Sequence, residues 1–309
     1  MRTLRIRAAI AAASLLVLAP SAALACACGC GVFDVGGVPL MANGQGGEAF
    51  VEYDYMNQTH NHAGTSGAPA ADNADKQIRS NFVLAGVQYM INHDWGVMAE
   101  LPVTNRLFRT ADSGAVDRFR DTAIGDVRLM GVYTGLSPDM STGLIFGVKL
   151  PTGDWKAAGF DRDTAIGSGS TDLILGGYHV GQLGRGAGPW GYFIQGQVDT
   201  PLAIQDNYRP GTEFDGAAGV SYDAGTVLGG RVKVAPVLQL IGSARAKDGG
   251  AEADPPNSGY ERVLISPGVE LDSGDWKLYG DVEFPVYQRV NGDQLVAPQL
   301  FKLVVSRRF

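Results

Sequence analysis

Apolar and other residues alternate along segment after segment of this 309-residue chain, and no other feature limits its fold as strongly. Residues 125–154 show the pattern clearly, because two alternating runs flank the polar break at 136–139. A side-chain period of two is typical of β-strands, and the Pro and Asp in the break favour a tight turn. The stretch is therefore expected to form a β-hairpin with one apolar face.

The same pattern predicts twelve strands and no helix in the mature chain, because no segment combines a sustained 3.6-residue period with helix caps. The predicted strands cover residues 47–56, 80–92, 94–106, 122–134, 141–151, 170–180, 190–202, 213–223, 229–244, 260–271, 275–290 and 294–309. Evenly spaced strands separated by turn signals imply a β-sandwich or a β-barrel.

The connections between these strands favour the barrel. Those after even-numbered strands are short, whereas those after odd-numbered strands are mostly longer and polar, with only 291–293 as a short exception. This asymmetry is typical of outer-membrane barrels, whose strands need only about 9–11 residues to cross the membrane. The fold class is therefore expected to be all-β, a transmembrane antiparallel up-and-down barrel of about twelve strands with both termini in the periplasm.

Two further features indicate a Gram-negative outer membrane. An interfacial girdle is expected where aromatic residues fall near the short-turn ends of apolar faces, as do Trp95, Tyr133, Trp190, Tyr222 and Trp276. The chain ends in Phe309 with alternate apolar residues before it, a signature that barrel assembly machinery reads. Outer-membrane lipid and this machinery are therefore the expected partners, together with a small-molecule solute.

If the apolar face meets lipid, the opposite face lines the lumen. The predicted lumen-lining residues carry both signs of charge: Glu52, Asp54, Glu100, Arg106, Asp126, Arg128, Lys149, Asp172, Asp199, Asp215, Arg231, Lys233, Arg262, Asp281 and Glu283. Opposite charges on neighbouring strands predict interior ion pairs. Such pairs either fill a narrow barrel and rigidify it or line a selective polar channel, and both interpretations stay open.

Residues 1–25 have the three parts of a signal peptide: a basic start, an apolar core over 8–18 and an A-x-A cleavage motif at 23–25. Cleavage would remove Arg2, Arg5 and Arg7, and these three positive charges change the formal net charge from −7 to −10. Such an acidic chain is not expected to bind nucleic acid, which requires a basic surface. The Gly-rich residues 26–46 are expected to form an irregular segment that hangs in the periplasm or plugs the barrel of residues 47–309.

All three cysteines, Cys26, Cys28 and Cys30, lie in the motif CACGCG. In an extended chain their spacing places three thiols on one side, where they could hold a soft metal such as Cu(I) or Zn(II). Lipidation of Cys26 is a second interpretation, and a flexible end with incidental or paired thiols is a third. No other cofactor is expected.

The sequence does not predict an enzyme. A barrel-embedded hydrolase needs Ser, His and a polar orienting partner, and none of the four histidines, His60, His62, His93 and His179, has a convincing catalytic partner. The run Gly167-Ser168-Gly169-Ser170 loosely resembles a phosphate loop, but it leads into a strand rather than a helix, which argues against that interpretation.

Three motifs resemble those of a known barrel family. They are Gly125-Asp126 at the start of one strand, 151–154 (PTGD) at the end of the next, and 169–172 (GSTD) at the start of the third. With them the chain resembles the outer-membrane barrels described as transporters of the phenol meta-cleavage pathway (the MetA-pathway of phenol degradation type). The resemblance covers roughly residues 123–179 and implies a channel for aromatic or other hydrophobic compounds, whereas CACGCG is not part of that pattern.

These observations lead to a main hypothesis and two alternatives. The main hypothesis is a monomeric, porin-like channel for passive passage of a small aromatic or hydrophobic molecule, gated by the N-terminal segment or a long loop. One alternative is a metal-binding or redox-partner scaffold built on the three cysteines. The other is a structural barrel with a packed interior.

Overall fold

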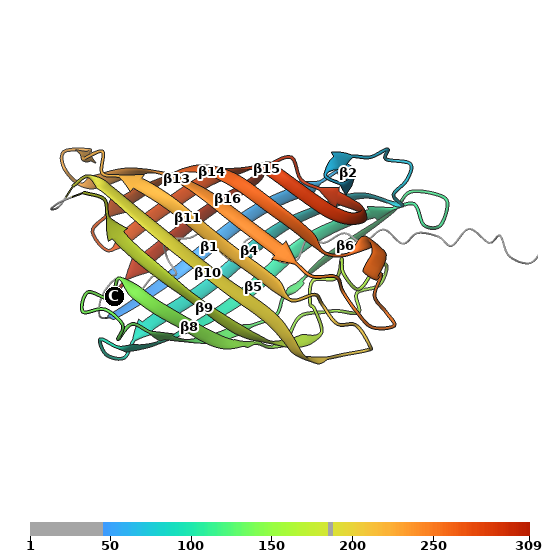
Figure 1. Cartoon of the computed structure of the whole chain (residues 1–309), viewed down its shortest axis with the longest axis horizontal. Coiled ribbons are helices and arrows are strands. Elements are labelled where there is room, and N and C mark those ends of the chain that lie inside the picture. The colour runs from blue at the N-terminus through green and yellow to red at the C-terminus, as the bar shows by residue number, and fades with distance from the viewer. Residues whose placement is uncertain (1–45, 185–187) are drawn as a thin grey trace, which may run out of the picture.

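The computed structural model describes residues 46–184 and 188–309, which form one closed antiparallel β-barrel (Figure 1). The wall has twelve strand positions, and the short strands β6 and β7 share the fourth. In order, the wall strands are β1 (Gly46–Gln58), β4 (Asp75–Met90), β5 (Trp95–Thr110), β6 (Asp117–Ile124), β7 (Arg128–Tyr133), β8 (Thr142–Lys149), β9 (Ser170–Gln182), β10 (Trp190–Ile204), β11 (Glu213–Tyr222), β13 (Val232–Arg245), β14 (Tyr260–Ser273), β15 (Trp276–Val296) and β16 (Leu300–Arg308). Pairing of β1 with both β4 and β16 closes the wall, which confirms the predicted fold class.

The outer surface of the wall is apolar. In β1, Val51 is 50% exposed, whereas Glu52 and Asp54 are 7% and 2% exposed. Large apolar side chains protrude in the same alternating way from most of the other strands. This belt on a closed wall, in which every strand is hydrogen-bonded to neighbours, is what lipid requires, and the chain is a transmembrane barrel of the outer membrane.

Among the residues that the structure describes, no helix is long and apolar enough to cross a membrane.

The two ends of the barrel differ as predicted (Figure 1). Short connections and the C-terminus lie at one end, where Trp95 packs on Tyr133 and Trp190 packs on Tyr222, with ring centroids 4.8 and 4.9 Å apart. The long connections at the other end carry β2 (His60–Gly64), β3 (Ser66–Gly67) and the 3-10 turn η2 (Pro255–Asn257). We refer to the half of the lumen near the short turns as the inner half, and to the half near the long loops as the outer half.

Two strand boundaries differ from the predictions. Strands β4 and β5 extend outward as a long hairpin from Asp75 to Thr110, because polar residues beyond the membrane continue the ladder. The predicted turn at 291–293 is wrong: it is a bulge within β15, and the true turn follows Val296. Beyond the bulge, β15 pairs with β2, and the Asn291 side chain donates to the carbonyl oxygens of Ser258 and Gly259 instead of closing a turn.

The wall ladder breaks at the predicted 122–134 strand. Strand β6 pairs with the outer part of β5, and β7 pairs with the inner part of β5 and with β8. Among the described strands, β6 has β5 as its only partner. The interruption at 125–127 directs this part of the chain toward the lumen, where the site described below begins.

Apolar side chains gather in the inner half of the lumen beside a few buried polar ones, such as Gln88 opposite Met98 and Gln195 opposite Tyr178. The apolar side chains form the inner apolar cluster, part of one continuous buried core: Phe50, Met90, Met98, Met130, Val132, Ile145, Tyr178, Phe193 and Val237. Met98 and Met130 are directly opposite each other on β5 and β7. The lumen is therefore polar over only part of its length.

Candidate functional site

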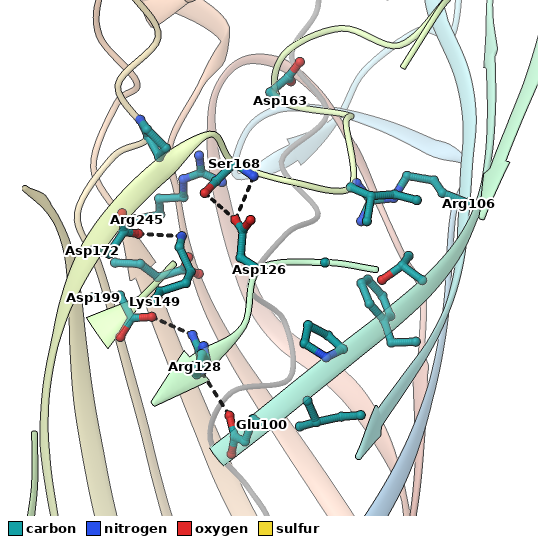
Figure 2. A pocket seen from close by; sticks show the side chains of 18 of the residues that line it. Glu100, Arg106, Asp126, Arg128, Lys149, Asp163, Ser168, Asp172, Asp199 and Arg245 are labelled. Carbon is teal, nitrogen blue, oxygen red and sulfur yellow. Dashed lines mark hydrogen bonds and ion pairs between the residues drawn. The ribbon is translucent and has the colours of Figure 1, made fainter. Parts of the chain in front are cut away.

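A cavity of about 150 Å³ lies in the barrel interior, in the outer half of the lumen (Figure 2). Strands β4 and β5 supply an apolar side through Phe82, Leu84 and Pro102, and the β8–β9 loop adds Ile166. Charged side chains from β5, β7, β8, β9 and β10 supply much of the rest. The cavity is therefore amphipathic, with an apolar surface facing a charged one.

The charged surface is a cross-strand row. The register places Glu100 of β5 opposite Arg128 of β7, Arg128 opposite Lys149 of β8, and Lys149 opposite Asp172 of β9. The two bases are neighbours, and their repulsion is offset by an acid at each end of the row. Sequence parity predicted these inward positions, and only the register brings them into one row.

Short ion pairs neutralise the row (Figure 2). Arg128 Nη2 lies 2.6 Å from Asp199 Oδ2, and its Nη1 lies 4.0 Å from Glu100 Oε2. Lys149 Nζ lies 2.5 Å from Asp172 Oδ2. These side chains are at most 16% exposed, so the pairs are shielded from water and their electrostatic interaction is strong. A solute at this row meets paired charges, although the cavity lining as a whole has eight acidic and five basic residues.

Asp126 fastens the break in the wall to the β8–β9 loop. Its carboxylate accepts hydrogen bonds from the backbone N–H of Gly153 at 2.9 Å, from the backbone N–H of Ser168 at 2.8 Å and from the Ser168 hydroxyl at 2.5 Å. Gly153 and Gly167 touch here, and a Cβ on Gly153 would lie 2.6 Å from the Gly167 Cα. Two of the three motifs that carry the family resemblance thus meet at this carboxylate, and the third begins one residue after Ser168.

Arg106 holds the same loop inside the barrel. Its side chain is only 1% exposed, and Nη1 donates to the carbonyl oxygens of Thr164 and Ala165 at 2.7 and 2.9 Å. Nε donates to Ser80 Oγ at 3.0 Å, and the guanidinium lies 5.6 Å from the centre of the Phe82 ring. A guanidinium that satisfies backbone carbonyls on one side and contacts an aromatic face on the other fixes the loop over the cavity.

Two further outer loops cover the cavity through Asp248. Its carboxylate accepts hydrogen bonds from Arg245 at 2.8 Å, from the Tyr208 hydroxyl at 2.6 Å and from the Gly211 N–H at 2.8 Å. The Arg162 guanidinium lies over the Tyr208 ring at 4.7 Å. Residues of three outer loops therefore form a single cap.

The opposite wall carries a second, tightly packed charge cluster. Lys302 of β16 stands between Asp54 of β1 and Asp281 of β15 in the register, and its Nζ lies 3.0 Å from Glu52 Oε1. One oxygen of Asp281 accepts hydrogen bonds from Ser266, Tyr279 and Gln239. All are buried, and Glu283 beside them is 1% exposed.

Most predicted lumen residues lie in the cavity wall: Glu52, Asp54, Glu100, Arg106, Asp126, Arg128, Lys149, Asp172 and Asp199. Outside the cavity, Asp215, Asp281 and Glu283 are buried, and half-buried Arg262 packs its guanidinium on Tyr260. The placement of Arg231 and Lys233 in the lumen is wrong. Both are exposed at the short-turn end, where Lys233 pairs with Asp223 at 3.0 Å. Beyond Val237, β13 runs past its pairing with β11 and forms a small hairpin with β12 (Thr226–Val227), and these residues lie in that hairpin.

The predicted thiol site at Cys26, Cys28 and Cys30 lies outside the described residues, as does the predicted signal peptide. Both stay predictions.

Strand parity missed the loop residues of the cavity wall. Arg162, Asp163, Ser168 and Tyr208 all come from connections that the sequence assigned to the exterior. The one available signal was the Gly-Ser-Gly-Ser run at 167–170, where small residues permit close backbone approach. Its role is to receive Asp126, not a phosphate.

The fold resembles solved outer-membrane proteins. The crystal structure of the COG4313 outer membrane channel from Pseudomonas putida F1 matches 89% of this chain and 100% of that chain, with a TM-score of 0.68 and 14% sequence identity. The beta domain of the Bordetella autotransporter Brka matches 86% of this chain and 100% of that chain, with a TM-score of 0.51 and 15% identity. No family model and no curated protein matches the sequence. At these identities the likeness is one of fold, and the phenol-pathway family stays a prediction.

Proposed function

We propose that the chain is an outer-membrane channel for small, largely apolar solutes, aromatic compounds among them. The observation that carries this proposal is the order of surfaces along the lumen. A solute from outside meets the amphipathic cavity first and then the inner apolar cluster. Each surface restricts which solutes can pass.

The size of the cavity favours a single aromatic ring. Its volume is about 150 Å³, and an apolar protein cavity of about 150 Å³ binds benzene. Phe82, Leu84 and Pro102 supply an apolar surface for such a ring, and the paired charges opposite them can receive a hydroxyl or carbonyl group.

The inner apolar cluster disfavours ions and sugars. Moving a polar group without a hydrogen-bond partner into apolar surroundings costs roughly 2–7 kcal/mol, and a bare charge costs more. Methionine side chains are flexible and polarizable, so Met90, Met98 and Met130 can yield to an apolar solute without leaving a permanent hole. Hydrophobic constrictions of this kind exclude ions by losing water.

The break in the wall offers an apolar solute a second way out. Gly125 and Pro102 lie both at this break and in the cavity wall, and β6 continues from there with β5 as its only partner among the described strands. We infer that a solute could leave the cavity sideways into the membrane here. Passage through the inner apolar cluster is the alternative route.

Uptake by cells tests the proposal, because the outer membrane itself is the barrier that the channel would breach. A Gram-negative host without its general porins would produce the protein, and the rate of uptake of a radiolabelled neutral compound with one aromatic ring would be measured. Wild type should raise this rate, whereas its single-channel conductance for salt in planar bilayers should be low.

Two variants of one strand provide the matched comparison. Leu84→Trp fills the cavity and should abolish the gain in uptake, whereas Val83→Trp faces lipid and should leave it intact. Uptake that is unchanged by Leu84→Trp would contradict the cavity as the path. Folded wild type without any uptake gain would favour the structural barrel with a packed interior.

A further inference from the structure

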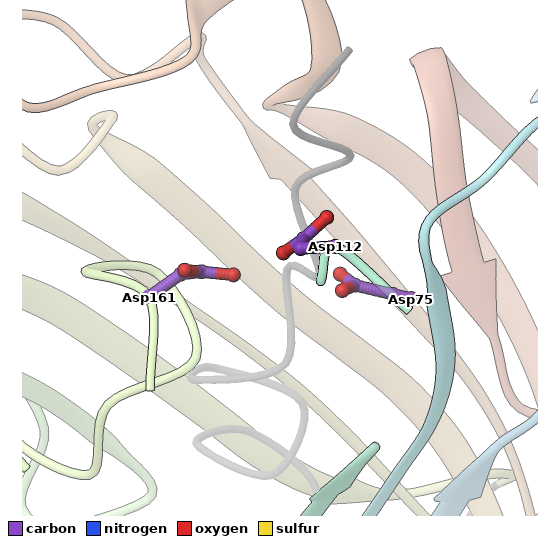
Figure 3. Close-up of side chains that lie close together, drawn as sticks. All are labelled: Asp75, Asp112 and Asp161. Atoms are coloured by element: carbon purple, nitrogen blue, oxygen red, sulfur yellow. The ribbon is translucent and has the colours of Figure 1, made fainter. Parts of the chain in front are cut away.

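Three aspartates from separate segments meet at the long-loop end of the barrel (Figure 3). Asp75 is the first residue of β4, Asp112 lies in the β5–β6 turn, and Asp161 lies in the β8–β9 loop. One carboxylate oxygen of each lies within 4.8 Å of those of the other two. Two ligands on opposite sides of a Ca²⁺ ion, each about 2.4 Å from it, are about 4.8 Å apart, so one ion can touch all three carboxylates.

Asp75 is buried without a partner for its charge. Its side chain is 2% exposed, and its Oδ2 accepts no hydrogen bond from any described residue. The hydroxyl of Thr110, its cross-strand neighbour, is also buried, and its polar interaction with Asp75 offsets the burial of that carboxylate only in part. In Figure 3 the carboxylate of Asp75 points toward that of Asp112. Burying an unpaired carboxylate costs free energy, and a cation bound at this oxygen would offset that cost.

The surroundings add negative charge and no compensating base. Burial, and then the charges of Asp163 and Asp161, raise the pKa of Asp75 to about 8. Burial, and then Asp163 and Asp112, raise the pKa of Asp161 to about 7. Within residues 46–184 and 188–309, no Lys, Arg or His forms an ion pair with any of the three.

We propose that Asp75, Asp112 and Asp161 bind a divalent cation, with calcium as the best fit. The ligand atoms are all hard carboxylate oxygens, which disfavour soft metal ions. Calcium accepts six to eight oxygens in flexible geometry, which suits ligands from three loops, whereas magnesium demands a near-ideal octahedron. Water and backbone carbonyl groups complete the coordination.

The ion would connect the cap to the wall. The β8–β9 loop that carries Asp161 also carries Arg162, Asp163 and Ser168 of the cavity wall. Binding would tie this loop to the outer end of the β4–β5 hairpin, in addition to its attachment to Asp126. The site is separate from the cavity, so its existence does not depend on the proposed channel function.

Calcium titration of the full-length folded barrel, purified in detergent without lipopolysaccharide and treated with EDTA, tests the proposal. Calorimetry should give one saturable site per chain, with a dissociation constant on the order of 0.1–1 mM, as in extracellular calcium modules. Calcium should also raise the thermal midpoint, and an equal concentration of magnesium should have a smaller effect.

Asp112→Asn and Asp161→Asn should each weaken calcium binding at least tenfold, and Asp75→Asn should abolish it. Asp117→Asn is the matched control. Asp117 lies in the β5–β6 hairpin, as Asp112 does, but its carboxylate accepts a hydrogen bond from Ser113 and is not part of the cluster. Heat-modifiable migration would verify that each variant is folded, and exposed Asp112 gives a variant that leaves the buried position intact. Absence of saturable binding to folded wild type up to about 10 mM calcium, well above the range of such modules, would overturn the proposal, and so would equal binding in all four variants.

Discussion

The outer and inner halves of the lumen are built by the same strands but present opposite chemistry. In the outer half, β7 and β8 contribute Arg128 and Lys149 to a row of paired charges. Nearer the short turns, the same two strands contribute Met130, Val132 and Ile145 to the inner apolar cluster. The change occurs within two residues of Arg128 along one inward face. An inward position therefore does not imply a polar position, and under the proposed function a solute would meet both halves in series.

The most direct way to remove the contrast is to make the inner half polar. The double variant Met98→Ser/Met130→Ser replaces two apolar side chains that face each other across β5 and β7. Lowering the desolvation barrier by at least about 1.4 kcal/mol should raise salt conductance roughly tenfold or more. Planar-bilayer recording would measure this. The control is Leu129→Ser, which changes the lipid-facing neighbour, 46% exposed, and should leave conductance unchanged. Equal conductance of the double variant and wild type would show that the inner apolar cluster is not the barrier to ions.

In the outer half, loss of one charge should instead lower the stability of the barrel. Arg128→Ala removes the guanidinium that pairs with Asp199 and Glu100 in a shielded site, and the free energy of unfolding should fall by about 3 kcal/mol. Guanidinium unfolding of the barrel in detergent would measure the loss. The exposed pair of Arg289 with Glu261 provides the control, because Arg289→Ala should cost at most about 1 kcal/mol. Similar costs for both variants would show that water reaches the cavity row freely.

A smaller loss of stability is expected when the β8–β9 loop of the cap is released from the wall. Asp126→Ala removes the acceptor for Gly153 and for both groups of Ser168, with an expected cost of about 2 kcal/mol. Because these bonds hold the β8–β9 loop, limited proteolysis should cut between residues 152 and 168 faster than in wild type. Asp139→Ala, at a turn on the opposite end, should not change that cleavage. A loop that stays equally protected in both variants would argue against Asp126 as its anchor.

The smallest predicted effect lies in the short turns, outside both halves. A hydrogen bond to Asp94, with a further one to the Pro138 carbonyl, raises the pKa of His93 above its usual value. The protonated form is thus favoured in the folded state. Any stability it contributes is present below the unfolded pKa and is lost as pH rises through the folded pKa. NMR titration should show a raised pKa that falls in Asp94→Asn, and no change in salt conductance should accompany the titration.

The strand pattern predicted the lipid face and the barrel well, because both follow from local periodicity. Val51 and Glu52 point to opposite sides in any register, so parity alone separates them. The same reasoning failed at Arg231 and Lys233, which lie in a small hairpin beyond the pairing of β13 with β11, and at residues 291–293, where a bulge imitated a turn. Local sequence does not distinguish these cases, because neighbouring segments supply the hydrogen bonds that decide between them.

By itself, the sequence determined a closed wall of alternating strands, its apolar belt, its aromatic girdle and the inward direction of most charges. Tertiary structure decided which of these charges meet. Glu100, Arg128, Lys149 and Asp172 form one row only through the register of three strand pairs. It also decided that the loop carrying Ser168 folds inward onto Asp126, and that Asp75 and Asp161, 86 positions apart in the sequence, come within 4.8 Å of each other. The physical reason is range: periodicity is fixed by neighbours along the chain, whereas a cavity and a cation site require groups that only the closed barrel brings together.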